Sequence, residues 1–303
     1  ENAEIAINAG FFEIGDVQDG RPTGTSVNDG KIFGVRTSKH ACLVKNSGRV
    51  TVELLEPSLS IKIGDHVIKP GRFNRFARGK KIFYFNRHWG VSTLSAYNAR
   101  KEVIVDQENK IISISTHGNN PIPEGGAVIS FPKNADLGYM SQGQVVTWNW
   151  SPKYFTDKKS FAVMGIPALI IDGKIQDGLS NKAKHARTAV GIKKDGKLVV
   201  AIVEHVYKGK LSDITIKDIK KIAERKNLSL ANLKIYDIVQ TISNDLSKMG
   251  NVVGFTTLEL ANFMQKQGCV SAINLDGGGS STLYIKGQYI NQSIGDNDEA
   301  VGQ

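Results

Sequence analysis

Short apolar runs separated by turn residues dominate this chain. Asp-Gly pairs, each followed by Lys, and one Lys-Gly pair interrupt apolar or β-branched segments, which is the pattern of β-hairpins. The predicted turns are Asp29-Gly30, Asp172-Gly173, Asp195-Gly196 and Lys286-Gly287. The clearest buried strands are predicted at residues 169–171 and 198–203, and further strands at residues 5–8, 81–85, 102–105, 127–130 and 270–275. The framework is therefore mostly β-strands.

Helical spacing of apolar residues is concentrated late in the chain. Residues 215–225 and 229–249 predict a helical hairpin, inserted at about 211–250. Thr256 and Glu259 have capping-box spacing, so another helix should begin there and end near Gly268. Its Leu258, Ala261 and Met264 would face the core.

The fold class that follows is α+β. We expect one mixed, β-rich domain over residues 1–303, with several hairpins, flanking helices and the inserted helical hairpin, because no repeat and no clean linker interrupts the chain. Hydrophobic residues make up 40% of the chain, enough for a substantial core.

The charge balance is basic. Lys and Arg number 39 against 29 Asp and Glu, a formal +10. This balance permits anionic partners without choosing among them. The cations are scattered apart from small clusters at residues 72–81 and 217–226, and no nucleic-acid motif accompanies them. We therefore expect a solvated lysine-rich surface and no specific nucleic-acid partner.

Three features of the sequence concern the cellular environment and processing of the protein. Two cysteines, Cys42 and Cys269, allow one disulfide or two free thiols. No run of eighteen apolar residues predicts a transmembrane helix. The chain opens on a charged residue and a strand, without a signal peptide, so we expect its numbering to begin at a processed or trimmed end.

The richest stretch for chemistry is residues 274–282. A buried strand delivers Asp276 into three glycines, and hydroxyl residues follow them. Glycines let a ligand approach the backbone, and exposed N–H groups in such a turn can bind an anion. A tight turn whose Asp bonds its own backbone is the alternative interpretation.

Other candidates lie at the ends of predicted strands. Arg187 offers a planar charged fork suited to phosphate, or else a buried ion pair. Glu204 follows a very apolar strand and is equally a surface residue or a catalytic acid, whereas Glu259 has a capping role available to it. Asn8 both donates and accepts, as sugar hydroxyls require. The histidines show no compact metal-ligand spacing, which leaves only a metal held by carboxylates and carbonyls.

Taken in order, these segments resemble the phosphodiester glycosidase family, typified by N-acetylglucosamine-1-phosphodiester α-N-acetylglucosaminidase. The similarity covers nearly the whole chain. The matching segments are Asn8-Ala9-Gly10-Phe11-Phe12, residues 24–30, Phe83-Tyr84-Phe85, Trp89-Gly90-Val91-Ser92-Thr93, residues 122–130, Arg187-Thr188-Ala189-Val190-Gly191, Thr257-Leu258-Glu259-Leu260-Ala261 and residues 274–281.

The chain departs from the family in three places. Members usually carry Asp-Gly where this chain has Glu204-His205, which puts the role of Glu204 in question. The predicted helical hairpin is longer than the usual connection. Sequence usually precedes the Asn8 segment, and a trimmed precursor would explain its absence.

The resemblance implies hydrolysis of a sugar-1-phosphodiester, with release of the sugar and a phosphomonoester. Asp276 is then the first catalytic acid, Glu204 or Glu259 the second, and Arg187 stabilises the phosphate. The substrate-binding residues would be Asn8, Gly10, His185, Thr188, Gly277, Gly278, Gly279, Ser280 and Ser281.

The remaining expectations concern partners. The substrate would be a sugar-phosphate or glycan, and the resemblance implies an extracytoplasmic or secreted protein. No cofactor is required, although a divalent cation is compatible with the residues. The alternative from a different class is a non-catalytic glycan- or polyanion-binding module on the same fold.

Overall fold

A computed structural model describes residues 3–15, 20–204, 206–207 and 252–291. They divide into two compact units. Unit 1 combines the described residues of Glu1–Ala9 and Ile166–Gln303, and unit 2 is Gly10–Gly165. Unit 1 is assembled from both ends of the chain, and unit 2 is inserted between them in the sequence. The single domain expected over residues 1–303 stays a prediction. The predicted helical hairpin at about 211–250 lies outside the described residues.

Unit 1 is built on a five-stranded antiparallel sheet in the order β16-β15-β21-β17-β18. Its strands are β15 (Ala168–Ile171), β16 (Lys174–Ile175), β17 (Arg187–Lys193), β18 (Leu198–Val203) and β21 (Cys269–Asn274). The Asp172-Gly173 turn joins β15 to β16 as predicted. Both residues have positive φ, 48° and 77°, as the tightest hairpin turns require.

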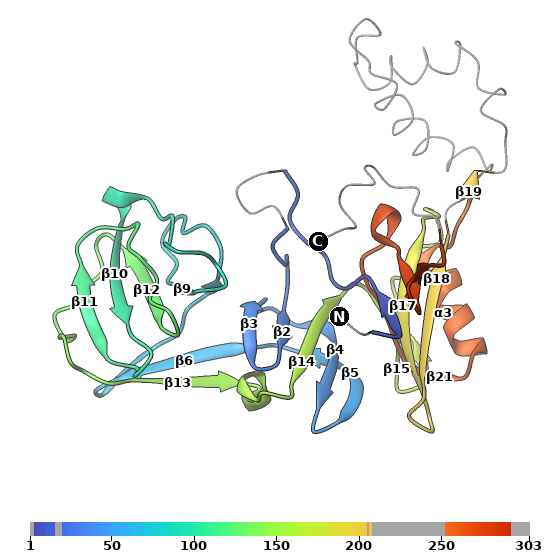
Figure 1. The fold of residues 1–303 in the computed structure, drawn as a ribbon, viewed down its shortest axis with the longest axis horizontal. Coiled ribbons are helices and arrows are strands. Elements are labelled where there is room, and N and C mark those ends of the chain that lie inside the picture. The colour runs from blue at the N-terminus through green and yellow to red at the C-terminus, as the bar shows by residue number, and fades with distance from the viewer. Residues whose placement is uncertain (1–2, 16–19, 205, 208–251, 292–303) are drawn as a thin grey trace, which may run out of the picture. The chain divides into compact units, whose positions relative to one another are not determined.

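Helix α3 (Thr257–Lys266) packs against this sheet (Figure 1). Thr256 and Glu259 form the predicted capping box, and the helix ends just before Gly268, where φ is 83°. Ala261 and Met264 are fully buried as predicted. Leu260 rather than Leu258 completes the buried face. Together with Leu169, Ile170 and Ala272 of the sheet, these side chains form the core of unit 1.

The strand at residues 198–203 corrects one expectation. Its apolar run predicted a buried strand, but β18 lies at the edge of the described sheet and leaves Leu198 51% and Val200 41% exposed. Only Ala201 is buried among its residues. An apolar run alone does not distinguish an edge strand from a central one.

Two small antiparallel sheets complete the described part of unit 1. The first has the order β1-β22-β23, and the second pairs β19 with β20. Their strands are β1 (Ile5–Ile7), β19 (Val206–Tyr207), β20 (Val252–Val253), β22 (Leu283–Ile285) and β23 (Gln288–Tyr289). The register of β1 on β22 pairs Ile7 with Leu283. It therefore places Asn8 beside Thr282, at the end of the glycine-rich stretch.

Unit 2 contains three sheets, ordered β11-β10-β12-β9-β8, β13-β6-β7 and β3-β2-β14-β4-β5. Their strands are β2 (Ser26–Asn28), β3 (Lys31–Gly34), β4 (His40–Asn46), β5 (Arg49–Leu55), β6 (Ser58–Ile63), β7 (His66–Ile68), β8 (Arg72–Phe73), β9 (Phe83–Asn86), β10 (Arg100–Val105), β11 (Ile111–Ser115), β12 (Ala127–Pro132), β13 (Val146–Ser151) and β14 (Phe161–Gly165). Short 3-10 turns lie at η1 (Tyr97–Ala99) and η2 (Lys153–Thr156).

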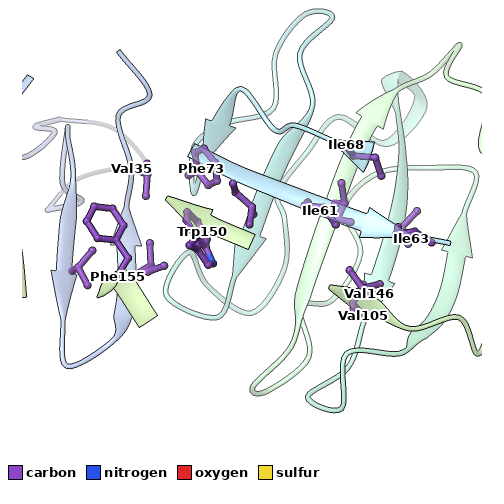
Figure 2. Close-up of a cluster of buried hydrophobic side chains, with 14 of the residues drawn as sticks. Val35, Ile61, Ile63, Ile68, Phe73, Val105, Val146, Trp150 and Phe155 are labelled. Atoms are coloured by element: carbon purple, nitrogen blue, oxygen red, sulfur yellow. The ribbon is translucent and has the colours of Figure 1, made fainter. Parts of the chain in front are cut away.

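One apolar cluster runs through all three sheets of unit 2 (Figure 2). Ile61 and Ile63 lie along β6 within it, and both are fully buried. Phe73 packs beside Trp150, with 5.3 Å between the ring centroids. This continuous core makes unit 2 a packed body in its own right.

The described residues are thus mostly β-sheet with one α-helix, in agreement with the β-rich part of the predicted fold class. Cys42 and Cys269 are free thiols, each buried in the core of its own unit. Within the described ranges, no helix is long and apolar enough to cross a membrane.

Candidate active site

One end of the five-stranded sheet gathers several predicted site residues. β17 begins at Arg187 opposite Val203, the last residue of β18, so Glu204 follows directly beside that strand start. Ala189 of β17 pairs with Asn274, the last residue of β21. The antiparallel register therefore brings Arg187, Glu204 and the segment leading to Asp276 to the same end of the sheet.

Asn8 ties this end of the sheet together through its carboxamide. Its Nδ2 donates to the carbonyl of Asp276 at 2.8 Å, and its Oδ1 accepts from the Thr188 hydroxyl at 2.6 Å and from the Thr282 N–H at 3.1 Å. The backbone of the next residue, Ala9, accepts from the Asp276 N–H at 3.1 Å. Both ends of this amide are therefore used within the protein, so the side chain holds the turn in place.

Thr188 extends the same network beneath the turn. Its side chain is fully buried, and its hydroxyl lies 3.3 Å from the Ser281 hydroxyl, which is also buried. Its backbone carbonyl accepts from the Leu275 N–H at 2.9 Å. Two substrate-binding candidates, Thr188 and Ser281, are therefore interior supports of the turn in this structure.

Asp276 is the titratable group at the centre of the turn. Burial raises the pKa of its carboxyl, and hydrogen bonds from the Ser280 side chain and the Gly277 N–H oppose that rise. The Gly277 N–H donates to Asp276 Oδ1 at 2.9 Å. A partly desolvated carboxylate with few donors retains basicity that a fully solvated one lacks, as a nucleophile or base requires.

The glycine turn lies directly against the start of β17. The Gly278 N–H donates to the Ala186 carbonyl at 3.0 Å, and a Cβ at Gly277 would meet that same oxygen at 2.8 Å and the Arg187 Cα at 3.7 Å. Gly278 has a φ of 62°, which favours glycine. These two positions therefore need glycine for close approach and for backbone shape.

The N–H groups of the turn are largely engaged within the protein. Those of Gly277 and Gly278 donate as described, and those of Ser280 and Ser281 donate to the carbonyls of Gly277 and Gly278 within η6 (Gly278–Ser280). Anion binding by these N–H groups, and by Gly279, stays a prediction. It would require the turn to open.

Among the residues that the structure describes, the hydrogen-bond acceptors of the Arg187 guanidinium are backbone carbonyls. Its Nε donates to the Phe255 carbonyl at 3.0 Å and its Nη2 to the Ala183 carbonyl at 3.3 Å. Desolvation lowers its pKa, yet no carboxylate lies within 4.0 Å of it among the described residues. A half-buried cation without a balancing anion favours an anionic ligand.

The backbones of His185 and Glu204 lie near that of Arg187: His185 precedes it by two residues, and Glu204 follows Val203, which pairs with Arg187. His185 pairs with Phe255, the residue that accepts from Arg187, through two backbone hydrogen bonds of 3.1 and 3.2 Å. Glu204 is exposed at the end of β18. Their proposed roles, contact with substrate oxygen and second acid respectively, stay predictions.

Glu259 has a complete structural role at the start of α3. Its Oε2 accepts from the Thr256 N–H at 2.8 Å, and its Oε1 lies 2.9 Å from the Lys184 Nζ. The backbone bond from Thr256, followed by the Lys184 contact, lowers the pKa of its carboxyl. A carboxylate stabilised in its charged form on both oxygens is a poor proton donor at neutral pH.

Gly10 differs from the other candidates because it belongs to unit 2. A Cβ there would meet Val163 Cγ2 at 2.8 Å and the Met164 carbonyl at 3.0 Å. Its lack of a side chain is therefore explained by packing against β14. Its role in binding substrate stays a prediction.

Sequence reasoning did not assign roles to three further residues of this network. Thr282 donates its N–H to Asn8. Asn291 accepts from the Leu283 N–H and donates to the Ser281 carbonyl, both at 2.6 Å. Asn274 is buried, donates to the carbonyls of Ile166 and Leu275, and leaves its Oδ1 without a partner among the described residues. Asn274 and Thr282 belong to the glycine-rich stretch at residues 274–282, whereas no local sequence pattern distinguishes Asn291.

The described residues contain no group of three or more His, Cys, Asp or Glu side chains arranged to hold a metal ion. Asp276 is the carboxylate of the turn, so a cation there would take its other ligands from hydroxyl and carbonyl oxygens. No metal is assigned to the site.

Comparison with known proteins gives concordant results. The model of the family described as "Phosphodiester glycosidase" matches residues 99–232 and 238–303. An uncharacterized protein of Rickettsia conorii (strain ATCC VR-613 / Malish 7) is 32% identical over 281 residues, which covers 87% of this chain and 97% of that protein. The family match includes the stretch around Asp276.

Two solved structures share the fold. A hypothetical protein from Synechocystis has a TM-score of 0.64 at 20% identity, covering 96% of this chain and 49% of that one. A protein of Burkholderia pseudomallei K96243, described as a candidate exported protein, has a TM-score of 0.66 at 18% identity, covering 99% and 64%. This chain thus spans about half to two thirds of those two chains.

Proposed function

This chain belongs to the phosphodiester glycosidase family, and from that premise we propose that it hydrolyses the glycosidic bond of a sugar-1-phosphodiester. The products are the free sugar, of the N-acetylhexosamine type, and a phosphomonoester. The observation that carries the proposal is the joint position of two groups at one end of the sheet. The Asp276 carboxylate has a pKa raised by burial, and the Arg187 guanidinium has no described carboxylate partner.

The chemistry of the reaction matches these two groups. Cleavage develops positive charge on the sugar, which a carboxylate stabilises or captures. The phosphate leaves as a weak base, so it needs charge stabilisation more than protonation, and a guanidinium supplies that. Asp276 serves the sugar and Arg187 the departing phosphate. The Gly277–Gly278 backbone packed on Ala186 and Arg187 holds both groups in the same neighbourhood.

For the second acid we favour Glu204 over Glu259. Glu204 follows the strand residue opposite Arg187, whereas both oxygens of Glu259 are engaged in the helix cap and with Lys184. His185, Ser280 and the turn glycines would orient substrate. Asn8, Thr188 and Ser281 would act through the turn that they support.

The decisive test is hydrolysis of a small substrate, the methyl phosphodiester of N-acetylglucosamine 1-phosphate. We expect release of free N-acetylglucosamine by the unmodified protein and none above background by Asp276→Asn. The matched control is Asp195→Asn, which neutralises an exposed carboxylate in the β17–β18 turn and should leave the rate unchanged. Equal activity in Asp276→Asn would remove the proposed centre.

The same assay tests whether hydrolysis depends on a cofactor and whether the protein is an enzyme or a non-catalytic binding module. We propose that bond cleavage needs no cofactor, so the rate should survive dialysis against a chelator; loss restored by a divalent cation would overturn that part. Tight glycan binding without hydrolysis across a panel of sugar phosphodiesters would instead favour the non-catalytic binding module. We also propose an extracytoplasmic location, supported by the family and by the description of the Burkholderia protein.

A further inference from the structure

The positive charge of this protein is concentrated in one unit. Residues 10–165 contain 21 Lys and Arg against 13 Asp and Glu, so they carry +8 of the formal +10. The proposed catalytic groups Asp276, Arg187 and Glu204 all belong to the other unit. Catalysis as proposed therefore does not account for the basic character of unit 2.

Within unit 2, one stretch of sequence is basic without any acid. Residues 66–101 contain nine Lys and Arg and no Asp or Glu. Four of these cations are exposed on and beside the connection from β8 to β9, namely Arg72, Arg78, Lys80 and Lys81. None of the four has a carboxylate within 4.0 Å among the described residues. We call these four residues the basic loop.

A buried arginine fixes the shape of the basic loop. Arg100 is 1% exposed, and its guanidinium donates to the carbonyls of Gly79 at 2.9 Å and Lys81 at 2.8 Å, and to Ser130. Burial lowers its pKa, because a charged group loses water there. Burying a charged group costs free energy. The hydrogen bonds of the buried Arg100 guanidinium fix the backbone of the exposed loop at Gly79 and Lys81. The loop is therefore anchored, with its charged side chains outward.

Neighbouring contacts keep the cations of the basic loop close to one another. The Gly71 N–H donates to the Ile82 carbonyl at 3.0 Å, and Arg72 pairs with Phe83 in the parallel register of β8 on β9. A Cβ at Gly71 would lie 3.7 Å from the Lys81 side chain, so Lys81 runs alongside the residue before Arg72. The Arg78 guanidinium lies 5.9 Å from the Phe76 ring centroid.

We propose that the basic loop is a docking surface for a polyanionic glycan whose sugars are joined by phosphodiesters. Four exposed cations without a carboxylate partner among the described residues suit a chain carrying several phosphates, whereas a single phosphate would call for an enclosed site. Nucleic acid fits less well, because single strands need exposed aromatic platforms. The ring nearest the cations, Phe76, is half-buried, with Arg78 and Trp89 packed about it. The identity of the polymer rests on the proposed function, but the existence of the docking surface does not.

The test compares two sets of substitutions that remove the same charge from unit 2. The loop variant is R78Q/K80Q/K81Q, and the matched control is K153Q/K158Q/K159Q, three exposed lysines before β14. Both sets are placed in an Asp276→Asn background, so that the probe is not hydrolysed during the measurement. The probe is a polymer of N-acetylglucosamine 1-phosphate, with single-stranded DNA as the second polyanion.

We expect the loop variant to bind the sugar-phosphate polymer at least about tenfold more weakly at low salt, with a shallower salt dependence, because fewer counterions are released. The control should lose less than about twofold on the same reasoning. Equal loss in both variants would overturn the proposal in favour of general charge attraction. Equal or tighter binding of DNA would overturn the glycan as partner, and unchanged binding in the loop variant would overturn the docking surface itself.

A second readout separates this inference from the proposed function. With Asp276 intact, the loop variant should hydrolyse the small methyl phosphodiester at the unmodified rate while its KM for the polymer rises. A fall in small-substrate kcat would contradict a pure docking role. If no variant hydrolyses the small substrate, the proposed function fails, and the binding comparison still decides whether the basic loop docks the polymer.

Discussion

Replacing Asn8 by alanine tests whether this side chain supports the turn or contacts substrate. The residue type of Asn8 alone predicts that its side chain binds substrate. In the structure, however, its amide forms hydrogen bonds with Asp276, Thr188 and Thr282. If the contacts are supportive, Asn8→Ala loosens the turn locally and lowers kcat by displacing the Asp276 carboxylate. Binding of small substrate would suffer less.

The size of the effect follows from the three hydrogen bonds. Their lengths are 2.6, 2.8 and 3.1 Å, and each contributes about 1 kcal/mol net. Truncation also leaves the Thr282 N–H without its partner, while the Thr188 hydroxyl keeps only Ser281 at 3.3 Å. The expected loss of local stability is about 2–4 kcal/mol. Because 1.4 kcal/mol is a factor of ten, amide exchange in the turn should accelerate roughly 30- to 700-fold.

Hydrogen exchange resolved by peptide, followed by mass spectrometry, measures this directly. Peptides covering residues 276–282 should exchange faster, whereas tryptophan fluorescence should not change, because all three tryptophans lie in unit 2. Asn149→Ala, an exposed asparagine on β13, is the matched control and should leave the turn unaffected. Unchanged exchange together with a raised KM would refute the supporting role and restore Asn8 as a substrate ligand.

Two further predictions concern titration and the second acid. Ser280→Ala removes a hydrogen bond that lowers the pKa of Asp276, so the pKa should rise further. If activity needs the ionised carboxylate, the acid limb of the profile of kcat/KM against pH moves to higher pH, and a limb that stays or moves lower would contradict that role. Glu204→Gln should reduce kcat by roughly a hundredfold or more, as loss of a general acid or base does. Glu259→Gln should leave kcat nearly unchanged, since Gln also completes a capping box with Thr256, and the reverse result would reassign the second acid.

Features determined by neighbours in the sequence were predictable. The Asp172-Gly173 turn needs two residues that tolerate positive φ, and both are adjacent in the chain. The start of α3 depends on Thr256 and Glu259, three residues apart. In such cases the sequence pattern contains the whole physical cause.

Features determined by distant partners were not predictable in the same way. The polar groups of Asn8 find their partners 180 to 274 residues away, so its residue type indicated hydrogen bonding without showing to what. Likewise the apolar run of β18 did not reveal that the strand lies at the edge of the described sheet. Asn291 carries no local signal at all, because its two bonds to the β22 segment depend on the fold of the sheet.

The pairing of β1 with β22 has a consequence for biosynthesis. Residues 5–7 leave the ribosome long before residues 283–285, which form their partner strand. Unit 2 is continuous in the sequence, so it can fold during this interval while the first strand waits. The Asp276 carboxylate acquires the support of Asn8 only after the β22 segment emerges. On the proposed function, a nascent chain halted before that point would be inactive toward sugar phosphodiesters, even with unit 2 already folded.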